Sequence, residues 1–185
     1  MADLMYAAGF AGAAILSIII ISNPISTSAI FVALTEEMDH KKKMAIVNRS
    51  IIYSTAILLF FAVTGLLLFQ LFGFSLGAFR MAGGVLLFTT AVSMLNPKTS
   101  QEEAEHVSSD IAIIPLSIPF TAGPGTITTV VVLMSEAESI MINSDLWTGI
   151  LCMIGIFIGI SLNTLVAYFM MTRSEKIDSY WGEGG

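Results

Sequence analysis

Two short stretches hold the residue types and spacings that do chemistry in this sequence, and each interrupts a long apolar run. Residues 22–28 read Ser-Asn-Pro-Ile-Ser-Thr-Ser, and residues 115–126 contain three prolines, two glycines and two threonines. Proline and glycine break helices and free backbone groups, while hydroxyl and amide side chains add hydrogen-bonding groups beside them. Where such a break lies in a bilayer core, it survives only if protein or a water-filled cavity covers it. The two stretches are therefore the predicted functional site.

The pair Asn23-Pro24 is a favourable start for a helix. Proline fits the first helical position, and the asparagine side chain can accept a backbone N–H from the next turn. The sequence thus predicts a half-helix that ends at Leu34, 11 residues or about 16 Å long, which is half the thickness of a membrane. A second half-helix is predicted to begin at Pro124, with Thr121 or Gly123 as its cap.

The N-terminal ends of the two half-helices are predicted to face each other near the middle of the membrane. Each end carries a partial positive charge and unpaired N–H groups, which suit a carboxylate such as that of an amino acid. Prolines 115, 119 and 124 also leave the carbonyls of residues 111, 115 and 120 without a helical donor, so these oxygens can bind an ammonium group or a sodium ion. The predicted binding residues are Asn23, Pro24, Ser26, Ser28, Thr121, Gly123, Pro124, Gly125, Thr126, Thr128 and Asn163. The alternative is that the prolines and hydroxyl residues only kink ordinary membrane helices.

The composition is that of an integral membrane protein. Of the 185 residues, 55% are hydrophobic and 12% are charged, against about 25% charged in soluble domains, and the mean hydropathy is +0.84. The net charge of −6 comes from acidic residues in the connections between apolar runs, so no nucleic-acid partner is expected. The single cysteine, Cys152, cannot form an internal disulfide and is expected to be a packing residue. The lipid bilayer is the predicted environment.

Five apolar segments are predicted to cross the membrane, which needs about 20 residues for each. They are residues 4–34, 50–72, 77–95, 111–134 and 147–171, and they are separated by a tight turn at residues 73–77 and by polar connections at 35–49, 96–110 and 135–146. With the 35–49 connection inside, seven lysines and arginines lie in the cytoplasm and only Arg80 lies outside. The chain is therefore predicted to be a multi-pass protein of the cell inner membrane with its N-terminus outside.

An internal repeat with an offset of 100 residues relates the two breaks. Setting residues 17–34 against 117–134 aligns Pro24 with Pro124 and the hydroxyl residues 26 and 28 with 126 and 128. Because the two segments cross in opposite directions, the fold class is predicted to be an all-α bundle with an inverted repeat of three helices. The single membrane domain, residues 1–185, divides into a first unit 1–95, the cytoplasmic connection 96–110 and a second unit 111–185. The second unit lacks a third helix, so we expect a sixth helix beyond residue 185 or one supplied by another chain, and we favour the former.

The same motifs resemble the MarC family of bacterial and archaeal inner-membrane proteins. The resemblance covers nearly the whole chain and rests on Asn23-Pro24 with Ile30-Phe31, on residues 80–88, and on Ile114-Pro115 through Gly123-Pro124-Gly125 to Thr128-Thr129. It implies a six-helix membrane protein. The family includes an archaeal member described as a transporter of small neutral amino acids, with glycine and alanine as substrates. This chain departs from the family pattern by lacking the sixth helix.

Within the predicted spans, Arg80 is the one charged residue, so the sequence offers no acid–base pair, metal cluster or proton relay. No enzymatic activity, cofactor or metal is expected. The sequence instead predicts a secondary transporter of small neutral amino acids that binds a small zwitterionic solute, with Na⁺ or H⁺ as a coupling ion, between two helix tips. The alternative is a structural or regulatory membrane protein that transports nothing.

Three smaller features are interpreted as packing or anchoring. Arg80 is expected to anchor its helix at the outer interface, and Gly83-Gly84 is expected to allow close packing against a broken helix. The spacing of Gly155 and Gly159 fits close helix contacts, either within one chain or in a homo-oligomer. Asn163, deep in the fifth span, either holds helices together or lines a pathway.

Overall fold

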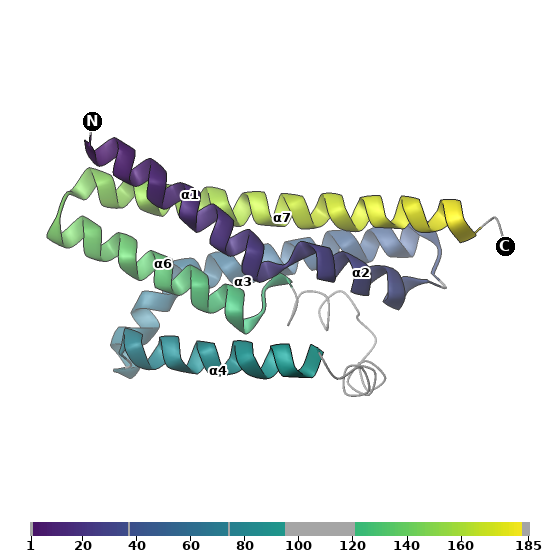
Figure 1. Cartoon of the computed structure of the whole chain (residues 1–185), viewed down its shortest axis with the longest axis horizontal. Helices are drawn as coiled ribbons and strands as arrows, with labels where there is room; N and C mark the ends of the chain where they lie inside the picture. The colour runs from purple at the N-terminus through teal and green to yellow at the C-terminus, as the bar shows by residue number, and fades with distance from the viewer. Residues whose placement is uncertain (1, 37, 74, 95–120, 183–185) are drawn as a thin grey trace.

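The computed structural model describes residues 2–36, 38–73, 75–94 and 121–182, and these form a bundle of helices (Figure 1). The helices are α1 (Ala2–Ser22), α2 (Pro24–Thr35), α3 (His40–Phe72), α4 (Leu76–Met94), α6 (Pro124–Asn143) and α7 (Leu146–Gly182). The predicted connection 96–110 and the first part of the predicted fourth span, with Pro115 and Pro119, lie outside the described residues. The described part confirms the predicted all-α membrane bundle.

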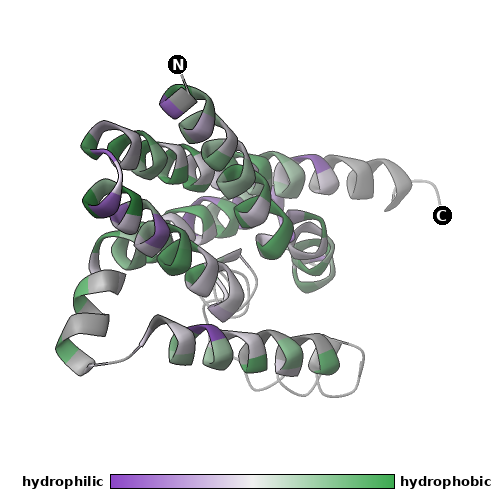
Figure 2. Cartoon of the chain, turned by 60° about the vertical axis from the view of Figure 1, so that its left-hand side comes forward, coloured by the Kyte–Doolittle hydropathy of each residue, from purple (hydrophilic) through white to green (hydrophobic). Residues whose placement is uncertain are grey.

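Four helical segments of the described chain are long and apolar enough to cross a membrane. They are Asp3–Thr35, which joins α1 and α2, then His40–Gly65, Pro124–Asn143 and Leu146–Ser174. α4, with 19 residues, coincides with the predicted third span. Hydrophobic side chains dominate the helices, whereas the strongly hydrophilic ones lie mostly toward helix ends (Figure 2). Large apolar side chains such as Ile20 and Phe60 are exposed on the bundle, as expected where lipid is the solvent.

Several helices extend beyond the predicted spans. α3 begins at His40, so most of the predicted 35–49 connection is helical, and α6 continues to Asn143 through most of the predicted 135–146 connection. α7 likewise continues past the predicted end of the fifth span at residue 171. The helices continue past the predicted spans because a change in hydropathy marks the edge of the hydrocarbon layer and not the end of a helix. A helix satisfies its own backbone and can continue into water.

The most extensive helix contact joins α1 and α7, and it shows how the two spaced glycines pack. A Cβ added to Gly155 would lie 2.5 Å from the Cβ of Ala11, and one added to Gly159 would lie 3.3 Å from the Cα of Ile15. The two glycines therefore pack α7 against α1 within one chain. This favours the predicted contact within one chain over a contact between two copies in a homo-oligomer.

α4 packs against α6 through two contacts. A Cβ on Gly83 would lie 2.5 Å from Cγ2 of Thr128, whereas one on Gly84 would meet nothing within 4 Å. Of the two glycines, Gly83 therefore makes the expected close contact, and its partner is α6, the helix that begins at the second break. Arg80 donates a hydrogen bond from Nη2 to Oε1 of Glu136 at 2.6 Å, with both side chains about half-exposed. Arg80 therefore joins two helices.

The buried apolar residues form two separate clusters. The larger cluster, from α1, α3, α6 and α7 and the residue before the second break, contains Ala7, Ala14, Ile18, Leu58, Ala62, Ala122, Val130, Met134, Ala137, Cys152, Ile156 and Ile160. The smaller cluster, from α2, α3 and α7, contains Phe31, Val47, Ala167 and Met171. Cys152 is buried in the larger cluster, as expected of a packing residue.

Replacing Gly155 by alanine is expected to destabilise the protein, because the new methyl group meets both the side chain and the backbone of Ala11. Overpacking of this kind costs about 1–3 kcal/mol. The measurement is the Tm of the detergent-solubilised protein. Gly12→Ala is the matched control, since Gly12 also lies in a packed helix pair but has nothing within 4 Å of its Cβ position. Equal Tm values for the two variants would show that α1 and α7 do not touch at Gly155.

Asp145, between α6 and α7, caps the start of α7. Its Oδ2 accepts hydrogen bonds from the backbone N–H and the hydroxyl of Thr148, both at 2.9 Å. These bonds, the backbone one first, lower the pKa of Asp145 below its ordinary value. A lowered pKa in the folded state means that the ionised carboxylate stabilises the fold above the ordinary pKa, and that this contribution is lost as the pH falls through the folded value.

Replacing Asp145 by asparagine is accordingly expected to destabilise the protein near neutral pH and to have a diminishing effect in acid. The test follows the Tm difference between wild type and Asp145→Asn from about pH 6 to about pH 3, across the ordinary range of an aspartate. Asp3→Asn is the control, since Asp3 is also acidic in the first turn of a helix at the same end of the bundle. A Tm difference that does not change with pH would contradict the capping role.

Candidate functional site

The first break lies at Asn23, as predicted. Asn23 adopts the left-handed conformation, with φ 46° and ψ 64°, and its side chain accepts the N–H of Ser26 at 3.3 Å. Asparagine is among the few residues that tolerate this conformation. Helical bonding of α1 ends with the Asn23 N–H donating to Ile19, and that of α2 begins with Thr27 donating to the Asn23 carbonyl. The single residue Asn23 therefore separates two helices and caps the second one.

The second break precedes Pro124, where α6 begins. Gly123 occupies the cap position in an extended conformation and offers no side chain, so the predicted cap is Gly123 and not Thr121. The N–H of Ile127 donates to the Gly123 carbonyl at 2.9 Å. The N–H groups of Gly125 and Thr126 precede the first helical bond, and neither has an acceptor within the described chain. Both residues are buried.

A buried hydrogen bond joins the two breaks. The hydroxyl of Ser22, the last residue of α1, donates to the backbone carbonyl of Thr121 at 3.1 Å, although the two residues are 99 positions apart. Figure 1 shows the end of α1 beside the start of α6. The two breaks are therefore joined through the end of α1 and the approach to α6. That the N-terminal ends of α2 and α6 face each other stays a prediction.

Buried polar side chains occupy the level between the two apolar clusters. We call this set the polar layer: Ser22, Thr27, Ser28, Ser50, Ser54, Thr121, Thr126, Asn163 and Thr164. On α7, Asn163 and Thr164 follow Ile160 of the larger cluster and precede Ala167 of the smaller one. On α3, Ser50 and Ser54 likewise lie between Val47 and Leu58. Each buried face thus changes from apolar to polar and back again along the helix.

Helix contacts place several members of the polar layer close to one level. Because Gly155 meets Ala11 and Gly159 meets Ile15, one further turn along both helices brings Asn163 level with Ile19, almost one turn before Ser22. Ser22 in turn is bonded to Thr121 beside the second break. The end of α1, the approach to α6 and the middle of α7 therefore meet in the polar layer.

Asn163 is the member of the polar layer whose hydrogen-bonding groups are unused. Its side chain is 0% exposed, and among the residues that the structure describes neither Oδ1 nor Nδ2 has a hydrogen-bond partner. An unsatisfied buried polar group costs about 1–3 kcal/mol, so the fold tolerates a penalty here that an apolar residue would avoid. Of the two predicted roles for Asn163, holding helices together has no hydrogen bond to support it within the described chain.

The remaining predicted residues divide into two groups. Pro24, Ser28, Gly123, Gly125 and Thr126 are buried around the breaks. Asn23 is exposed, and its side chain serves the helix cap, while Ser26 and Pro124 are half-buried. Thr128 faces Gly83 of α4 and donates its hydroxyl to the Pro124 carbonyl at 2.7 Å. The geometry therefore gives Asn23 and Thr128 structural roles at the edge of the polar layer.

Sequence reasoning missed Ser22, Ser50 and Ser54. Ser50 and Ser54 lie four residues apart in an apolar run, so they share one helix face, and this spacing was a usable signal. Ser22 belonged to the first predicted stretch but gave no sign of its distant partner Thr121. To predict a role for the Ser50–Ser54 pair or for Ser22, one must know which face of each helix is buried.

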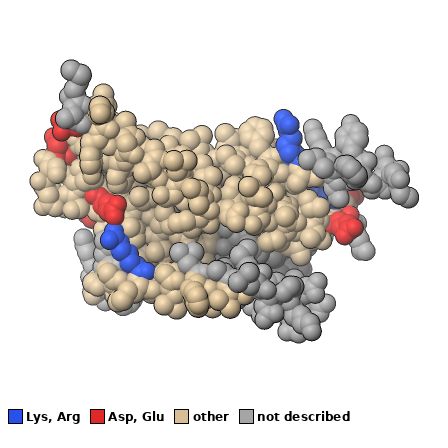
Figure 3. Space-filling model, in the orientation of Figure 1, with Lys and Arg blue, Asp and Glu red and all other residues tan. Residues whose placement is uncertain are grey.

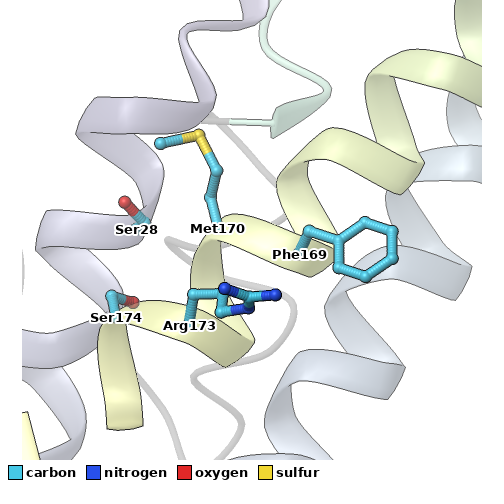
Figure 4. A pocket seen from close by; sticks show the side chains of 5 residues that line it. All are labelled: Ser28, Phe169, Met170, Arg173 and Ser174. Atoms are coloured by element: carbon cyan, nitrogen blue, oxygen red, sulfur yellow. The ribbon is translucent and has the colours of Figure 1, made fainter. Parts of the chain in front are cut away.

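A cavity of about 370 Å³ lies beside the polar layer, between α2 and α7. It is lined by Ser28, Phe169, Met170, Arg173 and Ser174, and Figure 4 shows Ser28 on α2 across from Met170 and Ser174 on α7. Ser28 belongs to both the cavity and the polar layer, whereas Arg173 lies three turns of helix beyond Asn163. The cavity thus leads from the polar layer toward the end of the bundle where Arg173 lies.

Charged side chains lie away from the polar layer. Figure 3 shows acidic and basic groups gathered toward the two ends of the molecule, with an uncharged middle on the face in view. Among the residues that the structure describes, no three His, Cys, Asp or Glu side chains come together as metal ligands. The polar layer therefore offers only neutral donors and acceptors to a bound solute.

Replacing Asn163 by leucine, which is similar in size, is expected to stabilise the ligand-free protein or leave its stability unchanged. The variant removes two unsatisfied polar atoms from a fully buried position, a gain of about 1–3 kcal/mol before any packing change. The measurement is the Tm in detergent without added solute. A matched control is Thr164→Val, because Thr164 is also buried but its hydroxyl donates to the carbonyls of Ile160 and Ser161. A large loss of stability in Asn163→Leu alone would show that the amide has a structural partner.

Comparison with known proteins identifies the family. The chain matches the MarC family, described as MarC family integral membrane protein, over residues 9–185. It is 37% identical over 170 residues to the UPF0056 membrane protein YvbG of Bacillus subtilis, a match that covers 88% of this chain and 78% of that protein. No solved structure matches the chain.

Two further relatives come from other lineages. A UPF0056 membrane protein of Methanocaldococcus jannaschii is 38% identical over 130 residues, which cover 67% of this chain and 63% of the relative. One of Aquifex aeolicus is 38% identical over 127 residues, which cover 65% of this chain and 59% of the relative. The matches thus span about three-fifths of the length of these two relatives. The extent of the family match and the level of identity show that the chain belongs to the MarC family of integral membrane proteins.

Proposed function

We propose that this protein is a secondary transporter of small neutral amino acids, which bind in the polar layer between the two helix breaks. The observation that carries the proposal is the buried bond from Ser22 to Thr121, because it joins the end of α1 at the first break to the approach to α6 at the second break. Discontinuous helices that meet inside a membrane bundle are a common way to build a solute site.

The chemistry of the polar layer suits a zwitterion with no further charge. The free N–H groups at the start of α6, with the partial positive charge of a helix N-terminus, suit a carboxylate. Neutral oxygens of the polar layer suit an ammonium group. A charged side chain on the solute has no opposite charge to meet there, and burying an unpaired charge costs several kcal/mol or more.

The distribution of basic residues supports a cytoplasmic location for one end of the bundle. Lys41 and Lys42 at the start of α3 and Arg173 near the end of α7 lie at the same end (Figures 1 and 3). The positive-inside rule makes this the cytoplasmic end and places the N-terminus outside. The cavity between α2 and α7 then opens toward the cytoplasm, and we take it as the route to the polar layer in a cell inner membrane.

A non-transporting structural or regulatory role is the second candidate. It is favoured by Asn23 and Thr128, whose polar groups serve the helix cap and the contact with α4. In that case the breaks only shape the bundle, and the protein binds no solute. We assign no enzymatic activity in either case.

The test is uptake of radiolabelled glycine and alanine by liposomes that contain the purified protein, under sodium and proton gradients. Gly123→Leu places a large side chain at the buried second break and is expected to reduce uptake about tenfold or more, the effect of losing about 1.4 kcal/mol of binding. Gly12→Leu is the control, because Gly12 is exposed with free space around it. No uptake by the wild type under either gradient would favour the non-transporting role.

A further inference from the structure

We propose that the cavity between α2 and α7 binds an anionic phospholipid, phosphatidylglycerol, with the lipid phosphate on Arg173 and an acyl chain along α7. The cavity has a volume of about 370 Å³, and its lining consists of Ser28 from α2 and of Phe169, Met170, Arg173 and Ser174 from α7. The inference goes beyond the proposed transport of amino acids. It takes from that proposal only the orientation, which puts Arg173 at the cytoplasmic end.

Arg173 is the charged residue of the lining, and its guanidinium group is available to a ligand. Its side chain is exposed, and it makes no ion pair or hydrogen bond with another residue that the structure describes. Arg80, at the other end of the bundle, is by contrast paired with Glu136 at 2.6 Å. A guanidinium group holds its N–H donors in a planar fork that can bind two oxygens of one phosphate. Arg173 therefore suits a phosphate group.

The cavity is apolar beside this charge. Phe169 is the last of a row of exposed apolar side chains, spaced three or four residues apart along one face of α7, which also contains Ile154, Ile158, Leu162 and Leu165. Arg173 follows Phe169 by four residues, and Figure 4 shows both side chains pointing to the same side of α7. One helix face thus changes from apolar to positively charged at the cavity. A lipid has the same order of groups, an acyl chain followed by a phosphate.

The two serines of the lining distinguish between phospholipid headgroups. The hydroxyl of Ser28 donates to the Ile25 carbonyl at 2.8 Å, and that of Ser174 donates to the Met171 carbonyl at 2.9 Å. A hydroxyl group has one proton and two lone pairs, so each serine can offer a headgroup only an acceptor.

The glycerol headgroup fits both serines and the arginine. Its hydroxyl groups can donate to Ser28 and Ser174, and they carry no charge. An ethanolamine headgroup also has donors, but its ammonium group would add a second positive charge beside Arg173. A choline headgroup has no donor at all. Phosphatidylglycerol therefore combines a phosphate for Arg173 with neutral donors for the serines.

The position of the cavity in the bundle also suits an anionic lipid. Arg173 lies at the same end as Lys41 and Lys42, where Figure 3 shows basic groups. Basic pockets between membrane helices on the cytoplasmic side are known binding sites for anionic headgroups. A lipid in this cavity would occupy the route that we propose for the solute, so lipid binding and solute entry would exclude each other.

The experiment measures lipid binding to the purified protein in detergent by native mass spectrometry. The probes are phosphatidylglycerol, phosphatidylethanolamine and phosphatidylcholine with the same acyl chains, and we expect the wild type to bind phosphatidylglycerol most tightly. Arg173→Gln removes the charge-assisted bonds to the phosphate. It is expected to weaken the apparent affinity for phosphatidylglycerol about tenfold or more. Ser28→Ala removes one acceptor and is expected to narrow the preference for phosphatidylglycerol over phosphatidylcholine.

The matched control is Lys42→Gln. Lys42 is an exposed basic residue at the same end of the bundle, lies 3.9 Å from Asp39 and is not part of the cavity lining. This variant loses the same charge and is expected to keep the affinity of the wild type. The Tm of each variant is measured beside lipid binding, so that a loss of fold is told apart from a loss of the site.

Several results would overturn the inference. One is an Arg173→Gln protein that binds phosphatidylglycerol as tightly as the wild type, and another is an equal loss in Lys42→Gln, which would assign the effect to the charge of the whole surface. Equal binding of the three lipids would show that the headgroup is not recognised. Competition by soluble glycerol 3-phosphate at the same concentration would assign Arg173 to a small anion. A dimer that Arg173→Gln dissociates, without bound lipid, would make a second copy of the chain the occupant.

The lipid site and the proposed transport are tested separately. Lipid binding is measured on the solubilised protein without any amino acid, and uptake is measured in liposomes. A wild type that takes up neither glycine nor alanine would overturn the proposed function and leave the lipid site untouched. A wild type that transports alanine but shows no preference for phosphatidylglycerol would overturn the lipid site alone.

Discussion

The hydrogen bond from Ser22 to the carbonyl of Thr121 helps to satisfy the backbone at an interrupted helix, which is the main constraint on this fold. A membrane interior supplies no water to backbone groups, so an interrupted helix must find partners within the protein. The first break solves this within itself, since Asn23 caps α2 and continues the bonding of α1. The second break is capped by Gly123, which has no side chain. The hydroxyl of Ser22 donates to the carbonyl of Thr121, two residues before this cap. The two breaks are therefore structurally complementary and must lie together.

The rest of the bundle fixes the level at which they meet. Gly155 and Gly159 bring α7 against α1 and set the position of Asn163 relative to Ser22, while Gly65 sets the position of α3 against α6. Two apolar clusters flank the polar layer along α3 and α7. Close backbone approach leaves little freedom to slide, because even one added methyl group would overlap a neighbour. The small residues thus position a polar site that lies several turns away from them.

The sequence predicted the local structure at the helix breaks. It did not predict which residues far apart in the chain would be bonded to each other. The pair Asn23-Pro24 predicted both the break and its cap, because those effects act within one turn of helix. The composition of the runs predicted a membrane bundle. It did not predict that α3 begins at His40 or that α6 continues to Asn143, since hydropathy follows the solvent and not the backbone bonding. The partner of Ser22 and the burial of Ser54 depend on helix rotation, which apolar runs do not encode when lipid surrounds them on one side.

The bond between the breaks also joins the two predicted repeats. Ser22 belongs to the first repeat and Thr121 to the second, and this bond crosses between them. The junction is a single neutral hydrogen bond, and such a bond contributes about 0.5–1.5 kcal/mol net to stability. A bond this weak can break at little cost, as movement of one repeat against the other would require.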